Sequence, residues 1–183
     1  ITEQSEDELV LDKNGETIVA KKTITESNNT ERLEFSDDDF FDEVPVFIGI
    51  LNGSFMVLSD LMKQYRGMCE VSFVKMASYE GTSSTNDVKQ LIGLNQDLEG
   101  RTVVVVEDIV DTGNTVEELK AIFKQKNVKH LKIATLFFKP EAYKKDIKID
   151  YVGIRIPNKF IVGYGLDYDG LGRNLADVYL LAQ

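Results

Sequence analysis

Hydrophobic residues follow two kinds of pattern along this chain, and the patterns alternate regularly from residue 45 onward. Continuous apolar runs of strand length recur, and the most apolar of them holds four successive valines, Val103–Val106. Runs of this kind are typical of strands that are covered on both faces. Between the runs lie segments whose apolar residues recur every three or four positions, as in amphipathic helices. We therefore expect buried strands in alternation with helices.

The patterns predict individual elements. Strands are expected at 45–51, 71–76, 88–94, 101–106, 130–138, 151–156, 160–164 and 178–181. One helix is expected at 55–65, with its buried face formed by Phe55, Leu58, Leu61 and Met62, and a second at 116–126. Strands that are separated by helical crossovers form a parallel sheet with helices on both faces. The prediction is an α/β fold with a mostly parallel central sheet flanked by helices, and ligands in such folds bind beyond the carboxyl ends of the strands.

Residues 1–44 are acidic and polar, and their periodicity is weaker. An alternation from Glu8 to Ala20 predicts a hairpin that turns at Lys13-Asn14-Gly15. The acidic run from Ser36 to Asp39 is read as a helix cap or a solvated loop, because consecutive carboxylates cannot all face one ion. The polar stretch 78–86 contains a glycine and predicts a loop.

Composition narrows the classes of function. The chain has 183 residues, enough for one domain with its own core, and a net charge of −10, which argues against a nucleic-acid partner. No stretch approaches the roughly 20 apolar residues of a membrane span, and the first residues lack the regions of a secretion signal. A single cysteine, Cys69, excludes an internal disulfide and fits the cytoplasmic location that we expect. A single histidine, His130, excludes a multi-histidine metal site.

The strongest chemical signal follows the valine strand: Glu107-Asp108-Ile109-Val110-Asp111-Thr112-Gly113-Asn114-Thr115. A short loop at a helix start offers free backbone N–H groups, and the helix dipole adds positive charge, so a phosphate can bind without a lysine. A glycine lets the backbone close around the anion. Two acids before the loop would repel the phosphate unless they bind sugar hydroxyls or a metal-bound diphosphate. The alternative is a helix capped by Asp111 or Thr112, with solvated acids.

This segment resembles the phosphoribosyl-pyrophosphate signature of the type I phosphoribosyltransferases, and the resemblance runs from about Pro45 to Leu181. It is closest to the hypoxanthine-guanine branch. The resemblance implies a purine-salvage enzyme, which transfers the 5-phosphoribosyl group from phosphoribosyl pyrophosphate to N9 of hypoxanthine or guanine and gives IMP or GMP and pyrophosphate. It also implies the type I fold, with residues 45–155 as the core domain and a small hood subdomain formed by the N-terminal segment 1–44 and the C-terminal base-binding segment 156–183.

The resemblance assigns roles within the motif. Glu107 and Asp108 would hold the ribose hydroxyls, partly through Mg²⁺. Asp111 would face N7 of the purine as general base or proton partner, since the N7 proton must leave as the N9 bond forms. The cradle for the 5-phosphate would consist of Thr112, Gly113, Asn114 and Thr115.

The turn after the first core strand is the expected pyrophosphate loop, Leu51-Asn52-Gly53. Relatives often have a cis peptide before the position that matches Asn52. Read by itself, the segment is a tight strand-to-helix turn with Ser54 as the helix cap. The resemblance adds two further contacts to the pyrophosphate, from the Ser78-Tyr79 loop, which would close over the site, and from Arg173.

The expected base-binding residues lie in the last third of the chain. Lys139 would donate to the purine O6, and Phe160 would stack on the base. Backbone carbonyls at Ile161 and Asp167 would meet the group at purine C2, and Asp167 would also bind a second Mg²⁺. Composition alone leaves blander interpretations open, with Lys139 as a solvated lysine and Phe160 as part of the core.

Two other functions share part of this pattern. An orotate- or adenine-type phosphoribosyltransferase would need the motif at 107–115 but not Lys139 together with Phe160 and Asp167. A regulator could keep the fold as a sensor of phosphoribosyl pyrophosphate that binds nucleic acid, although the net charge of −10 opposes this. We expect phosphoribosyl pyrophosphate and a 6-oxopurine as ligands, Mg²⁺ as cofactor, no nucleic-acid or membrane partner, and a homodimer or homotetramer.

Overall fold

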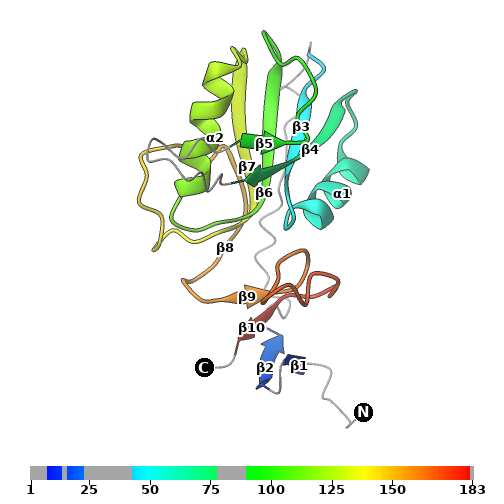
Figure 1. The fold of residues 1–183 in the computed structure, drawn as a ribbon, viewed down its shortest axis with the longest axis vertical. Helices are drawn as coiled ribbons and strands as arrows, with labels where there is room; N and C mark the ends of the chain where they lie inside the picture. Colours follow the sequence, from blue (N-terminus) through cyan, green and yellow to red (C-terminus); the bar gives the residue numbers. More distant parts are fainter. Residues whose placement is uncertain (1–7, 14–15, 23–42, 78–89, 182–183) are drawn as a thin grey trace, which may run out of the picture.

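A computed structural model describes residues 8–13, 16–22, 43–77 and 90–181 (Figure 1). Within these ranges, the larger sheet consists of β3 (Val46–Leu51), β4 (Glu70–Ala77), β5 (Gln90–Ile92), β6 (Thr102–Val110), β7 (His130–Phe138) and β8 (Tyr151–Arg155). The smaller sheet consists of β1 (Glu8–Lys13), β2 (Glu16–Lys22), β9 (Ile161–Val162) and β10 (Tyr179–Leu181). The described helices are α1 (Phe55–Gln64) and α2 (Asn114–Gln125).

The larger sheet is mostly parallel, as predicted. Its strand order is β5-β4-β3-β6-β7-β8, and only the edge strand β5 runs antiparallel to its neighbour among the strands that the structure describes. Val103 to Val106 of β6 are fully buried. Val104 and Val106 pack in the cluster that α1 covers, whereas Val103 and Val105 pack in the cluster that α2 covers. Successive strand residues point to opposite faces, so the valine run confirms a sheet with a helix on each face.

Several predicted boundaries were wrong. β6 does not end at Val106 but continues to Val110, because its ladder with β7 continues as far as Val110 opposite Phe138. The helix expected from Val116 already begins at Asn114. Phe55 keeps 40% of its surface exposed, and the buried residues of α1 are Val57, Leu58 and Leu61. No described helix is of a length and hydrophobicity that would let it cross a membrane.

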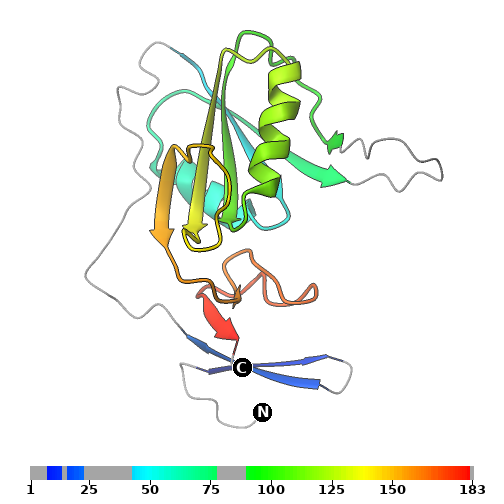
Figure 2. The ribbon, with the colours of Figure 1, turned by 90° about the vertical axis from the view of Figure 1, so that its left-hand side faces the viewer.

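The smaller sheet joins the two ends of the chain. The predicted N-terminal hairpin is confirmed by antiparallel pairing of β1 with β2, with Lys13 opposite Glu16. β10 pairs with β2 on one side and with β9 on the other. This sheet lies at one end of the molecule, and the carboxyl ends of β6 and β7 point towards the connection between β9 and β10 (Figure 2). Phe137 of β7 packs against Ile161, Leu166 and Val178, so the apolar residues of this region are continuous with the larger sheet.

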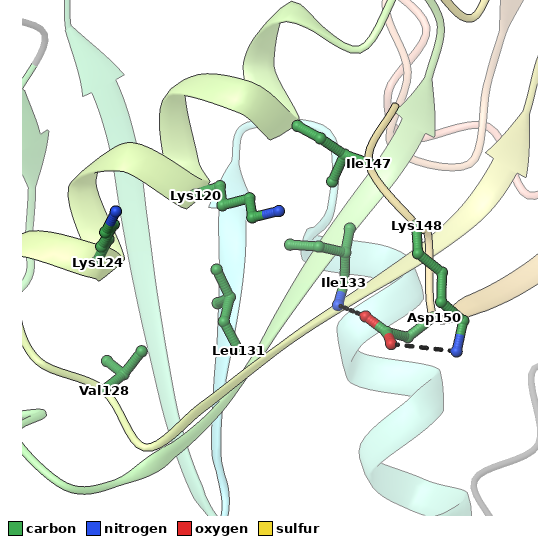
Figure 3. Close-up of a pocket in the computed structure, with 8 residues that line it drawn as sticks. All are labelled: Lys120, Lys124, Val128, Leu131, Ile133, Ile147, Lys148 and Asp150. Carbon is green, nitrogen blue, oxygen red and sulfur yellow. Dashed lines mark hydrogen bonds and ion pairs between the residues drawn. The ribbon is translucent and has the colours of Figure 1, made fainter. Parts of the chain in front are cut away.

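The connection from β7 to β8, residues 139–150, contains no helix. At the end of this connection, Asp150 forms hydrogen bonds with Ile133 of β7 (Figure 3). The Asp150 backbone N–H donates to the Ile133 carbonyl oxygen at 2.9 Å, and the Asp150 carboxylate accepts the Ile133 N–H at 2.9 Å. The next pair of the ladder is Ala134 with Tyr151. The Asp150 side chain therefore satisfies a backbone N–H at the point where the parallel ladder begins.

We expect Asp150→Ala to lower the free energy of unfolding by about 1–3 kcal/mol, because the buried Ile133 N–H loses its acceptor. Asp150→Asn keeps an acceptor oxygen and should lose less. The ion pair of Lys148 with Asp150 spans 3.7 Å and the lysine is exposed, so Lys148→Ala should leave stability almost unchanged. Urea unfolding measures all three variants, and equal stability of Asp150→Ala and wild type would contradict the assignment.

Candidate active site

Two carboxylates lie at the end of the buried strand β6. Glu107 is only 5% exposed, and its Oε1 atom has no hydrogen-bond partner among the described residues. Burial, and secondly the charge of Asp108, raises the pKa of Glu107 well above its ordinary value. Burial also raises the pKa of Asp108, although the Ile109 N–H, at 2.9 Å from Oδ1, and the charge of Arg173 act in the opposite direction. Buried polar atoms almost always have partners, so the lack of one at Oε1 of Glu107 points to a ligand that would supply it.

The loop between β6 and α2 is only three residues long, Asp111-Thr112-Gly113. Gly113 occupies the N-cap position with φ 87°, and no side chain caps the helix. The alternative interpretation, with Asp111 or Thr112 as the helix cap, is therefore wrong. The N–H groups of a first helical turn have no partners within the helix, so here they can bind an anion. Thr112, Asn114 and Thr115 are exposed around this end of α2.

The connection 139–150 packs against the loop between β6 and α2. A Cβ atom on Gly113 would lie 2.4 Å from Cε2 of Tyr143 and 2.8 Å from Cγ of Lys145. The Lys144 N–H donates to the Thr112 carbonyl oxygen at 3.2 Å. These contacts were not predicted, because no local pattern in the sequence shows that 139–150 returns to the loop. Gly113 is thus required both by its positive φ and by the close approach of Tyr143.

Lys139 and Asp111 form an ion pair with Nζ 3.0 Å from Oδ2. Each is the first residue after a strand, and the strand ends, Val110 and Phe138, are paired in register. Lys139 is 6% exposed, whereas 44% of the Asp111 side chain is accessible. The burial of Lys139 contradicts its interpretation as a solvated surface lysine. The pair places a cationic donor beside an anionic acceptor at the carboxyl end of the sheet.

The turn after β3 packs against Asp108 and against the C-terminal segment. The peptide between Leu51 and Asn52 is cis. A Cβ atom on Gly53 would lie 1.5 Å from Oδ2 of Asp108, and one on Gly165 would lie 2.1 Å from the Gly53 carbonyl oxygen. Three segments that are distant in sequence therefore meet where only glycines fit. The sequence analysis included Gly53 but missed Gly165.

Ser54 occupies the N-cap position of α1 without capping it. Its buried hydroxyl donates to the Ile50 carbonyl oxygen at 2.7 Å. The expectation that Ser54 caps the helix through its side chain is therefore wrong, because the hydroxyl closes the turn instead.

Asp167 and Arg173 form a second ion pair, with Oδ1 2.5 Å from Nη2. The other Asp167 oxygen accepts the Gly170 N–H at 2.7 Å, and Nη1 of Arg173 donates to the Gly165 carbonyl oxygen at 2.7 Å. The charge of Arg173 lowers the pKa of Asp108, while that of Asp167 raises it. This pair and Asp108 are therefore close enough to interact electrostatically.

Phe160 is 52% exposed and lies edge-on to Tyr168, with ring centroids 5.8 Å apart. Its exposure contradicts the interpretation of Phe160 as a core residue. Ile161 follows it in β9 and is buried. Tyr168 was missed, although it directly follows Asp167 in the sequence. The expected contacts of Ser78 and Tyr79 lie outside the described residues.

A cavity of about 330 Å³ lies elsewhere, between α2 and the connection 139–150 (Figure 3). It is lined by Lys120, Lys124, Val128, Leu131, Ile133, Ile147, Lys148 and Asp150. None of these belongs to the predicted site.

The carboxylates suit a hard cation that is shared with a substrate. Among the described residues, no three His, Cys, Asp or Glu side chains converge as metal ligands. Mg²⁺ usually keeps several waters and is held by one or two carboxylates plus substrate phosphates. The unpartnered oxygen of Glu107 and the neighbouring Asp108 fit that mode of binding, whereas an all-protein metal cage does not exist in the described part of the chain.

The family model described as phosphoribosyl transferase domain matches residues 17–169. This chain belongs to the phosphoribosyltransferase family. The hypoxanthine-guanine phosphoribosyltransferase of Streptococcus pyogenes is 44% identical over 146 residues, which cover 79% of this chain and 81% of the relative. That of Staphylococcus epidermidis is 42% identical over 139 residues, covering 75% and 78%. A hypoxanthine phosphoribosyltransferase structure from Staphylococcus aureus matches this phosphoribosyltransferase with a TM-score of 0.71 at 38% identity, covering 79% of each chain.

We expect Glu107→Gln to raise the free energy of unfolding of the ligand-free protein at neutral pH. The raised pKa of Glu107 means that the folded state holds a proton which the unfolded state loses above its usual value of 4.5. Stability therefore falls as the pH rises through this window, and the glutamine variant should escape the fall.

Denaturant unfolding at pH 4 and pH 8 measures this effect, which should be larger at pH 8. Glu99 is an exposed residue, and Glu99→Gln serves as a control that should change stability by less than about 0.5 kcal/mol. A Glu107→Gln variant that is less stable than wild type at pH 8 would show that Glu107 is compensated in the folded protein.

Proposed function

We propose that this phosphoribosyltransferase transfers the 5-phosphoribosyl group from phosphoribosyl pyrophosphate to N9 of hypoxanthine or guanine, in purine salvage. The observation that carries the base specificity is the ion pair of Lys139 with Asp111. A 6-oxopurine presents an acceptor, O6, next to N7, which carries a proton in the reacting tautomer. Lys139 donates to O6, and Asp111 accepts the N7 proton. The names of the relatives from Streptococcus pyogenes and Staphylococcus epidermidis support the same reaction.

The start of α2 binds the 5-phosphate. Its backbone N–H groups carry no side-chain cap, and the helix dipole favours an anion there. Thr112, Asn114 and Thr115 add side-chain donors, and Gly113 lets the backbone approach. Glu107 and Asp108 hold the ribose hydroxyls at the end of β6, where hydroxyl donors would satisfy carboxylates that are otherwise uncompensated.

The pyrophosphate group binds at the turn after β3, which packs against Asp108. Leu51-Asn52-Gly53 offers backbone N–H groups, and Arg173 adds a guanidinium whose geometry suits phosphate oxygens. Ser78 and Tyr79 complete this part of the site from their loop, which would exclude water from the reacting centre.

Glu107 and Asp108 would hold one Mg²⁺ together with substrate oxygens, and Asp167 would bind a second. When bound, the ion neutralises charge on the leaving pyrophosphate. Asp167 already has an ionic partner in Arg173 at 2.5 Å, so its carboxylate is held on the pyrophosphate side of the site.

During the transfer, the bond from ribose C1 to pyrophosphate breaks and the bond from C1 to N9 forms. Asp111 takes the N7 proton as N9 donates its electron pair. Phe160 stacks on the base, and backbone carbonyls at Ile161 and Asp167 accept from the exocyclic group at C2. Adenine places an amino group at C6, where the Lys139 ammonium has no acceptor, so the site disfavours it.

The smaller sheet forms a hood over this site. We assign residues 45–155 to the core domain, and 156–183 together with 1–44 to the hood, because β10 pairs with β2 on one side and with β9 on the other. A homodimer or homotetramer and a cytoplasmic location stay predictions.

The central test is turnover of phosphoribosyl pyrophosphate with hypoxanthine, guanine and adenine, with and without Mg²⁺. We expect formation of IMP and GMP, little AMP, and loss of turnover in excess chelator. Restoring Mg²⁺ in excess should restore the activity. Preferential use of adenine would overturn the proposed base, and full turnover without divalent ions would overturn the metal roles.

Lys139→Ala tests the reading of the base. The change removes a charged hydrogen bond worth about 1.5–3 kcal/mol, or roughly tenfold to over a hundredfold in kcat/KM with hypoxanthine and guanine. Because the 5-phosphate cradle is untouched, the affinity for phosphoribosyl pyrophosphate should hardly change. Lys139→Gln keeps a neutral donor and should lose less. An unchanged ratio of hypoxanthine to adenine efficiency in Lys139→Ala would remove Lys139 from base selection.

A further inference from the structure

The connection between β9 and β10 contains an unusual turn. Three successive residues have positive φ: Gly163 at 106°, Tyr164 at 51° and Gly165 at 98°. A bulky residue rarely adopts such a conformation, and it persists only where the surroundings hold it. The contacts of Tyr164 therefore determine where this turn lies.

Tyr164 connects the turn to α1. Its hydroxyl donates to Oδ2 of Asp60, which lies on α1, and its backbone N–H donates to the Leu175 carbonyl oxygen at 2.9 Å. The ring packs against the apolar cluster under α1 and also against the cluster around Phe137. Figure 1 shows this connection lying beneath α1.

The next residue, Gly165, contacts two parts of the site, Arg173 and the Gly53 turn. The Gly165 carbonyl oxygen accepts from Nη1 of Arg173 at 2.7 Å, and the Gly165 N–H donates to the Arg173 carbonyl oxygen at 3.0 Å. The same residue packs directly on the Gly53 carbonyl oxygen. A displacement of Tyr164 would therefore move Gly165, and with it both Arg173 and the contact of Gly165 with the Gly53 turn.

We propose that Tyr164 is a positioning residue, which uses its hydrogen bond to Asp60 to hold Arg173 and the Gly53 turn in register for the pyrophosphate group. The inference rests on the proposed function, because it takes that group as the ligand of Arg173. Tyr164 acts through its neighbours and does not touch the substrate.

The bond contributes to position more than to stability. Both groups are partly accessible, and an exposed hydrogen bond adds little to the free energy of unfolding. Tyr164→Phe removes only the hydroxyl and keeps the ring that fills the two clusters. Asp60 also pairs with Lys63 at 2.7 Å, which provides a matched control on the same carboxylate.

The test measures the Kd of phosphoribosyl pyrophosphate with Mg²⁺ by calorimetry, together with kcat and KM. We expect Tyr164→Phe and Asp60→Ala each to raise Kd and KM for this substrate about three- to tenfold, with kcat changed less than about twofold. The double variant should be no worse than either single one, since both changes break the same bond. Asp60→Asn keeps an acceptor and should stay near wild type, as should Lys63→Ala.

An unchanged Kd in Tyr164→Phe would overturn the inference, and so would additive effects in the double variant. A fall in the free energy of unfolding with kcat and Kd both altered would assign Tyr164 a merely structural role. These outcomes are separate from the proposed function. If wild type bound phosphoribosyl pyrophosphate but did not use hypoxanthine or guanine, the proposed base would fail, while the Kd comparison would still decide the role of Tyr164.

Discussion

The burial of two adjacent carboxylates at the end of β6 constrains the rest of the site. Pairing with β7 keeps the chain extended past Val106, so Glu107 and Asp108 remain in the sheet and largely out of water. Removing carboxylates from water is costly unless partners replace the hydration. Asp108 accepts the Ile109 N–H and feels the charge of Arg173, whereas Oε1 of Glu107 has no hydrogen-bond partner among the described residues. The burial of Glu107 therefore costs stability unless a ligand supplies that partner.

Apolar packing and a close backbone contact both connect the region of the smaller sheet with the larger sheet. Phe137 of β7 packs against Ile161, Leu166 and Val178, and Gly165 packs on the Gly53 carbonyl oxygen. Because glycines mediate the second contact, the backbones approach closely and leave little freedom for Arg173. The N-terminal hairpin adds to the same sheet by pairing with β10. Chain ends that are far apart in sequence thus contribute to one structural unit beside the site.

Local patterns predicted what local physics determines. Four valines identified a strand buried on both faces, and the segment from Glu107 to Thr115 identified the family. Features that depend on distant parts of the chain were missed. Pairing with β7 determines where β6 ends. Gly113 occupies the N-cap position of α2, where the close approach of Tyr143 leaves no room for a side chain. The exposure of Phe55 was also missed, since periodicity cannot show which face a sheet covers. The roles of individual site residues stay predictions.

The ion pair of Lys139 with Asp111 is the feature on which the proposed selection among bases depends. Its lysine is buried and its carboxylate is accessible, so a base can approach the carboxylate while the ammonium stays in place. Leaving a buried charge without a partner costs about 3–5 kcal/mol. A base that offers an acceptor to the ammonium and a proton to the carboxylate replaces both halves of the pair. A base that offers only donors at that edge replaces one half and leaves the ammonium uncompensated. We therefore propose that selection for an oxo group at C6 follows from the charge pairing already present in the protein.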